Sequence, residues 1–221
     1  KLLGIPVILR VESNLRFERS ASKLAVKRLF FNLLKLAVDC VVPIGKLNRE
    51  YWQHYFGEGF PAFSTPYAVD NEFFQCKSTE AALHREDFRR ALDLKPGLPV
   101  ILYVSKLQTR KRCIDLVDAF LRLASDSGEA TPAYLLIVSA SEERTAIEAR
   151  VRASGGSSIR LLGFRNQSEL PRYYDLCDVF VLPSLRETWG LVVNEVMNSA
   201  KPVIVTDQVG CPTWTGHLAP A

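Results

Sequence analysis

Segments typical of strands and segments typical of helices alternate along the chain, with short connections between them. The strand-like runs are short, apolar and rich in β-branched residues, whereas the helix-like runs are longer and carry charged residues. This alternation is typical of βαβ units, in which helices cover a sheet of parallel strands. It predicts an α/β fold with mainly parallel sheets, which bind ligands beyond the carboxyl ends of their strands.

The expected elements can be placed by residue number. Strands are expected at 5–11, 40–44, 63–69, 99–105, 133–139, 158–162, 179–182 and 202–206. Helices are expected at 20–38, 48–55, 78–92, 114–124, 142–153, 167–176 and 189–199. The composition shifts over residues 70–98, which include a Lys-Pro-Gly turn, and this predicts two domains at 1–74 and 75–221.

Composition and charge narrow the class of protein. Hydrophobic residues make up 48% of the 221 residues, which excludes a disordered chain, and no apolar run approaches the roughly 20 residues of a spanning helix. The net charge is +4, but residues 1–50 alone carry ten Lys or Arg and four acids. This basic part favours an anionic partner such as a phosphate or an acidic membrane surface, or simply a solvated helix face. Nucleic acid is not expected, because the cations are not interleaved with aromatic residues that could stack on bases.

The five cysteines and three histidines are scattered and form no metal-binding pattern, so neither a metal nor a cofactor is expected. Widely spaced cysteines fit reduced thiols, which predicts a cytoplasmic protein.

Two loops that follow expected strands carry unusual residues. Residues 105–112 place four cations directly after the strand at 99–105, and Lys106 and Lys111 at this position suit a diphosphate, although a basic loop can also be merely solvated. The turn at Gly163 and Phe164 could let backbone approach a flat ring, although most such turns have no ligand.

A third loop contains two glutamates separated by seven residues, Glu187 and Glu195. If a helix begins near Trp189, Glu187 lies before it and Glu195 on its second turn. The free amides at 189–191 would then form an anion site, and the two carboxylates could bind sugar hydroxyls. The alternative is a capped amphipathic helix with an ordinary exposed glutamate.

Four segments together resemble family 4 glycosyltransferases. SLRETWGLVVNEVMNSAKPVIVTD resembles the donor-site signature of that family, the E-x7-E motif, and SKLQTRK resembles its basic diphosphate loop. PYAVDNEFF resembles the segment that joins its two domains, and LLGFRNQSELPRYYDLCDVFVLPS the stretch before the glutamate motif. The order and spacing of all four agree across residues 66–207.

The resemblance implies a GT-B fold, in which two Rossmann-like domains face each other, with the first only partly present here. It implies that a sugar moves, with retention of configuration, from a nucleotide diphosphate sugar to a glycan or lipid-linked acceptor. Lys106 and Lys111 would stabilise the leaving diphosphate, and Glu187 would contact the sugar. The remaining donor-binding residues would be Ser105, Gly163, Phe164, Thr188, Trp189, Gly190, Leu191 and Glu195, with Glu195 on the ribose. No DxD motif occurs, so we expect a metal-independent reaction.

Some features depart from the family pattern. Ser105 and Lys106 stand where relatives have Gly and often Arg, and no histidine ends the strand at 5–11. Arg10 and Glu12 could line the cleft instead, or form a salt bridge. Relatives extend beyond both ends of this chain, so we expect a fragment with little activity alone; the other readings are a non-catalytic nucleotide-sugar-binding protein and a GT-B epimerase. The basic residues at 16–35 favour peripheral contact with the inner face of an acidic membrane. The alternative is a helix packed on the sheet by its apolar side, with its cations in water.

Overall fold

A computed structural model describes residues 4–16, 20–128, 133–139, 144–153 and 158–211. The chain divides into two compact units, which are described one at a time. The first unit comprises Lys1–Ala68, Arg186–Gly190 and Asp207–Ala221, and the second comprises Val69–Leu185 and Leu191–Thr206. The domain boundary expected after residue 74 stays a prediction.

Helices α1 (Ala21–Leu34) and α2 (Lys46–Phe56) of the first unit accompany two parallel strands, β1 (Ile8–Leu9) and β2 (Cys40–Val41). Their shared core is rich in aromatic residues, and Phe31 of α1 lies against four rings of α2. The buried members of this core are Phe31, Val38, Val41, Tyr51, Trp52, Tyr55 and Phe56. The strand expected at 63–69 is wrong: only Ala62 forms a bridge, to Val41, and Pro66 lacks the N–H that a ladder needs.

The second unit is built on a parallel five-stranded sheet with the order β5-β4-β3-β6-β7. Its strands are β3 (Val100–Val104), β4 (Tyr134–Val138), β5 (Ile159–Gly163), β6 (Val179–Leu182) and β7 (Val203–Val205). Central strands of such sheets are covered on both faces, and all five residues of β4 are buried. The α/β fold with parallel sheets expected from the sequence is confirmed.

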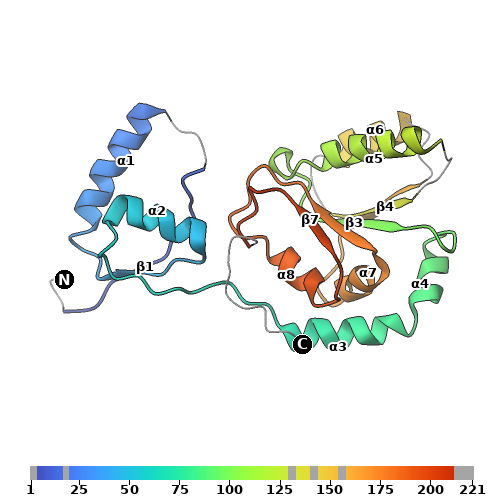
Figure 1. Cartoon of the computed structure of the whole chain (residues 1–221), viewed down its shortest axis with the longest axis horizontal. Coiled ribbons are helices and arrows are strands. Elements are labelled where there is room, and N and C mark those ends of the chain that lie inside the picture. The colour runs from blue at the N-terminus through green and yellow to red at the C-terminus, as the bar shows by residue number, and fades with distance from the viewer. Residues whose placement is uncertain (1–3, 17–19, 129–132, 140–143, 154–157, 212–221) are drawn as a thin grey trace. The chain divides into compact units, whose positions relative to one another are not determined.

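Helices cover both faces of this sheet (Figure 1). One face carries α5 (Cys113–Ser127) and α6 (Arg144–Ala153), and the opposite face carries α7 (Leu170–Leu176) and α8 (Leu191–Met197). A short 3₁₀ turn, η1 (Thr109–Lys111), precedes α5. Strand order reverses between β3 and β6, so the unit is a doubly wound sheet with a topological switch point between these two strands.

The helix expected at 78–92 is two helices, α3 (Asn71–Ala82) and α4 (Arg85–Ala91). The side chain of Asp70 caps α3 by accepting a hydrogen bond from the amide of Phe73, which explains its earlier start. Tertiary packing favours the break, because Phe88 of α4 lies against the ring of Tyr173 on α7, with 5.0 Å between centroids. No helix within the described ranges is long and apolar enough to cross a membrane.

Candidate functional site

The switch point brings together the loops that follow β3 and β6 at the carboxyl edge of the second unit's sheet. The two loops lead to helices on opposite faces, which leaves a ligand position between them in sheets of this kind. The amide of Leu185 donates a hydrogen bond of 2.8 Å to the carbonyl of Arg110, so the loops are joined. Thr206, just beyond β7, donates to the carbonyl of Ser184 at 2.5 Å. Three strand ends therefore form one connected rim.

The loop at 105–112 holds its four cations in different ways. Arg110 donates to the side chain of Gln108, and Arg112 forms an ion pair with Asp115. Lys106 is exposed and has no hydrogen bond or ion pair with any residue that the structure describes. Lys111 is only 9% exposed, and burial, assisted by the charge of Arg110, lowers its pKa to about 8. The rim thus presents one free ammonium group and one desolvated ammonium group.

Glu195 lies on the second turn of α8, as the sequence predicts, and its carboxylate is held by a hydrogen bond from a neighbouring helix. Tyr174 on α7 is fully buried, and its hydroxyl donates a 2.7 Å hydrogen bond to Oε2 of Glu195. Burial raises the pKa of Glu195, and the hydrogen bond from Tyr174 acts in the opposite direction. Burial and the neighbouring carboxylate raise the pKa of Tyr174 far above its usual range, so the phenol stays a proton donor. Tyr174 therefore fixes the orientation of this carboxylate.

The turn after β5 exposes an aromatic ring. Gly163 has φ +73°, a left-handed conformation in which any other residue would be strained. The Phe164 side chain that follows is 65% exposed. Nε of Arg165 donates a hydrogen bond of 2.7 Å to the hydroxyl of Tyr173, which holds the turn in place. A flat, exposed ring at the carboxyl end of a strand is suited to stacking on a planar group.

Two buried serines follow strands at this edge, and neither was among the site residues predicted from the sequence. The hydroxyls of Ser139, after β4, and Ser184, after β6, are buried and have no hydrogen-bond partner among the described residues. Buried hydroxyls are usually paired, so each of these two requires an explanation. Their signal in the sequence is weak: each is a small polar residue directly after an apolar run.

Residues 186–190, within the first unit, pair with residues 208–211. The amide of Glu187 donates to the carbonyl of Gln208, and its own carbonyl accepts from the amide of Gly210. A Cβ atom at Gly210 would lie 2.1 Å from the carbonyl oxygen of Thr188, so only glycine fits there. Helix α8 begins at Leu191, two residues later than predicted, so Trp189 precedes it.

The same unit contains the two expected cleft residues. Trp189 is buried and meets the ring of Tyr67 edge-on, with 5.9 Å between centroids. The guanidinium of Arg10 lies over the Tyr67 ring, 4.6 Å from its centroid. In the described part of the chain no ion pair joins Arg10 to Glu12, which is exposed, so the alternative of a salt bridge between them does not hold.

The predicted site residues thus fall into two groups. At the carboxyl edge of the second unit lie Ser105, Lys106, Lys111, Gly163, Phe164, Leu191 and Glu195. The first unit holds Arg10, Glu12, Glu187, Thr188, Trp189 and Gly190. No group of three or more His, Cys, Asp or Glu side chains placed to hold a metal was found among the described residues.

Residues 98–220, more than half of the chain, match the family model described as glycosyl transferases group 1. The chain belongs to this family. Within the curated proteins, the D-inositol 3-phosphate glycosyltransferase of Jonesia denitrificans is 30% identical over 138 residues, which are 60% of this chain and 32% of that protein. The matching residues span about a third of the length of these curated relatives.

Solved structures show the fold of the chain. The chain is similar to HepE of Anabaena in complex with UDP, with a TM-score of 0.74 and 17% identity, over 96% of this chain and 56% of that one. It is also similar to sucrose-phosphate synthase of Thermosynechococcus elongatus, with a TM-score of 0.68 and 22% identity, over 92% and 50% of the two chains. These are GT-B structures, so the expected GT-B fold is confirmed, with the chain covering about half of each.

Proposed function

We propose that this chain is part of a retaining family 4 glycosyltransferase, and that the E-x7-E motif at 187–195 belongs to its donor site. The enzyme would transfer a sugar from a nucleotide diphosphate sugar to a glycan or lipid-linked acceptor. One observation carries the proposal: Lys106 and Lys111 stand at the switch point of the sheet, where the joined loops form a rim. A diphosphate is the ligand that two ammonium groups at such a rim fit best.

Each donor group has a candidate partner. The diphosphate would lie against Lys106 and Lys111, and the base against the exposed ring of Phe164. The ribose hydroxyls would donate to the carboxylate of Glu195, whose Oε2 is already held by Tyr174. Glu187 would contact the transferred sugar, as its place in the motif implies.

The reaction requires stabilisation of the negative charge that develops on the departing diphosphate. Fixed cations in a partly desolvated site provide this without reorganisation, and Lys111 is such a cation. The two lysines thus supply charge of the kind that other transferases obtain from a divalent ion, which supports the proposal of a metal-independent reaction.

Replacing Lys106 by Gln is expected to weaken the binding of UDP, GDP and ADP roughly 10- to 100-fold, because one charge-assisted hydrogen bond to the diphosphate is lost. Isothermal titration calorimetry measures this directly. The matched control is Lys95→Gln, an exposed lysine just before β3 at the opposite edge of the sheet, which should bind as the wild type does. Equal affinities in the two variants would contradict the diphosphate assignment.

We also propose that α1 rests on an acidic membrane at the cytoplasmic side. Its side chains Leu29, Phe30 and Leu33 are exposed, and Lys23 and Arg28 accompany them. An apolar surface with cations beside it is suited to anionic lipid.

Changing Lys23 and Arg28 to Gln should weaken binding to phosphatidylglycerol vesicles by about 2 kcal/mol, or roughly 30-fold, at about 1 kcal/mol per cation. Lys27 is left intact because its ammonium lies over the rings of Tyr51 and Tyr55. Vesicle co-sedimentation is the measurement, with Lys46→Gln combined with Lys95→Gln as the control. Unchanged co-sedimentation of the Lys23 and Arg28 variant would count against membrane contact.

A further inference from the structure

A cavity of about 160 Å³ lies in the first unit between α2, the residues that follow it and the end of β2. Its lining residues are Val41, Arg49, Trp52, Gln53, Phe56, Gly57, Glu58, Phe60 and Ala62. An engineered protein cavity of about 150 Å³ admits benzene. The cavity therefore has room for one six-membered ring, and nothing in the donor site accounts for it.

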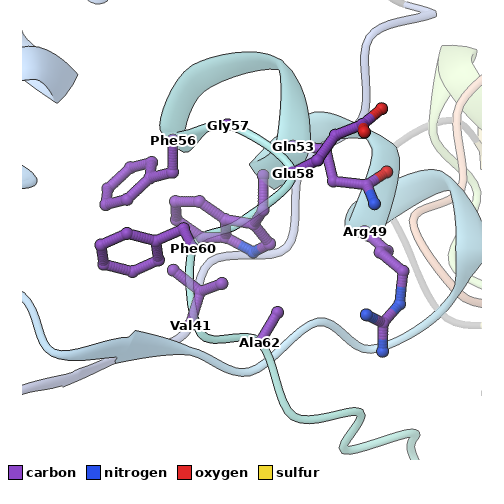
Figure 2. Close-up of a pocket in the computed structure, with 9 residues that line it drawn as sticks. Val41, Arg49, Gln53, Phe56, Gly57, Glu58, Phe60 and Ala62 are labelled. Carbon is purple, nitrogen blue, oxygen red and sulfur yellow. The ribbon is translucent and has the colours of Figure 1, made fainter.

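The cavity has an apolar side and a polar side, as Figure 2 shows. Phe56 and Phe60 lie together on one side, with their ring centroids 4.8 Å apart. Arg49, Gln53 and Glu58 lie on the other side. A ligand that fits here must offer an apolar face to the rings and hydrogen-bonding groups to the opposite wall.

A buried hydrogen-bond donor adds to the polar groups. Trp52 is 1% exposed, and its Nε1 has no hydrogen-bond partner within the ranges that the structure describes. Trp52 is also one of the lining residues. A buried N–H without an acceptor is unfavourable, so a ligand oxygen that reached this atom and accepted its hydrogen bond would be favoured.

The charges at the polar side indicate a neutral ligand. The Arg49 guanidinium is partly engaged, because its Nη2 donates to the hydroxyl of Ser64 at 2.6 Å. Glu58 is exposed and would repel an anion, just as Arg49 would repel a cation. Gln53 provides both a donor and an acceptor. Donors and acceptors around an aromatic wall are suited to a neutral ring that carries several hydroxyl groups.

We propose that this cavity binds one pyranose residue of the sugar acceptor. The C–H face of the ring would lie against Phe56 and Phe60. Its hydroxyls would accept from the Trp52 indole and exchange hydrogen bonds with Arg49, Gln53 and Glu58. The assignment of this sugar to the acceptor rests on the proposed function, whereas the binding of a pyranose by this cavity does not.

The test is a titration of the ¹⁵N-labelled protein with methyl glucoside, methyl mannoside and methyl galactoside, followed by NMR. The chain has three tryptophans, Trp52, Trp189 and Trp214, so its indole signals are few. Trp189→Phe and Trp214→Phe assign them without changing the core residue Trp52. At least one pyranoside is expected to shift the Trp52 Nε1–H signal saturably. Arg49→Gln should weaken that binding at least tenfold, whereas Lys46→Gln, one turn earlier on α2 and outside the lining, should not.

Two results would overturn the proposal. One is the absence of a saturable shift at Trp52 with every pyranoside. The other is an equal response to cyclohexanol, which would show a cavity that accepts any ring. A UDP titration of the same sample reports on the donor site separately, so failure of the sugar site can be told apart from failure of the proposed transferase function.

Discussion

Replacing Lys111 by Met is expected to lower the rate of sugar transfer about 10²- to 10³-fold while leaving the protein at least as stable as the wild type. The rate falls because a desolvated cation at the diphosphate is lost, and a single preorganised charge of this kind contributes that much to catalysis. The free energy of unfolding should not fall, because the lysine side chain is only 9% exposed and its burial disfavours the charged form. Substrate turnover by the whole enzyme of which this chain is proposed to be a part measures the first effect, and denaturant unfolding measures the second.

The dependence on pH gives the size and sign of the stability change. The pKa of Lys111 falls from 10.5 to about 8 on folding, which corresponds to an unfavourable contribution of about 3 kcal/mol at neutral pH. In the window between these two values the unfolded chain binds more protons, so this contribution to stability improves as pH rises through it. The gain from Lys111→Met should therefore be largest below pH 8 and fade towards 10.5.

The same group makes nucleotide binding depend on pH. A bound diphosphate favours the charged ammonium, so UDP affinity should fall as pH rises above about 8 in the wild type. Lys111→Arg, which cannot lose its charge in this range, should remove that dependence. Lys95→Met serves as the control for both rate and stability. A Lys111→Met protein that loses stability and activity together would show that the lysine has a structural role only.

Much of the fold follows from local sequence, because the second unit's strands are buried apolar runs such as Tyr134–Val138. The position of the basic loop at 105–112 could also be predicted, since residues just beyond such strands meet at one edge of the sheet. The expected helix start near Trp189 likewise places Glu195 on the second turn, where the structure has it. The two errors in the elements have tertiary causes. The break between α3 and α4 accompanies the packing of Phe88 on Tyr173. After the bridge at Ala62, the amides of Phe63 and Thr65 donate to the carbonyls of Val41 and Pro43, and no strand forms over residues 63–69.

Parts of the candidate site could not be read from the sequence. Tyr174 and Glu195 are 21 positions apart in the sequence and lie on different helices, so no local spacing indicates their hydrogen bond. The burial of the Ser184 hydroxyl, which has no partner in the described ranges, depends on how separate elements pack, and so does the cavity beside Trp52. The burial that lowers the pKa of Lys111 likewise comes from the fold, whereas its neighbour Lys106 has the same side chain and is exposed.

Changing Glu195 to Gln is expected to weaken the binding of UDP, GDP and ADP by the same factor, about 10- to 100-fold. The three nucleotides share the ribose, and hydrogen bonds from its hydroxyls to a charged carboxylate are stronger than those to a neutral amide. The fold should survive, because the amide oxygen can still accept from the Tyr174 hydroxyl. Tyr174→Phe should weaken the binding of the same nucleotides by a smaller factor, since it removes only the hydroxyl that orients Glu195. Glu86→Gln, an exposed glutamate on α4, is the matched control.

The most direct test of the donor site compares UDP with 2′,3′-dideoxy-UDP in the wild type and in Glu195→Gln, with all four dissociation constants measured by calorimetry. If Glu195 binds the ribose, the wild type loses affinity when the hydroxyls are removed and the variant does not, with a coupling free energy of about 1 kcal/mol or more. An equal loss of affinity in both proteins would contradict the assignment of Glu195 to the ribose. A wild type that binds none of UDP, GDP and ADP would contradict a nucleotide-sugar site at the carboxyl edge of this sheet.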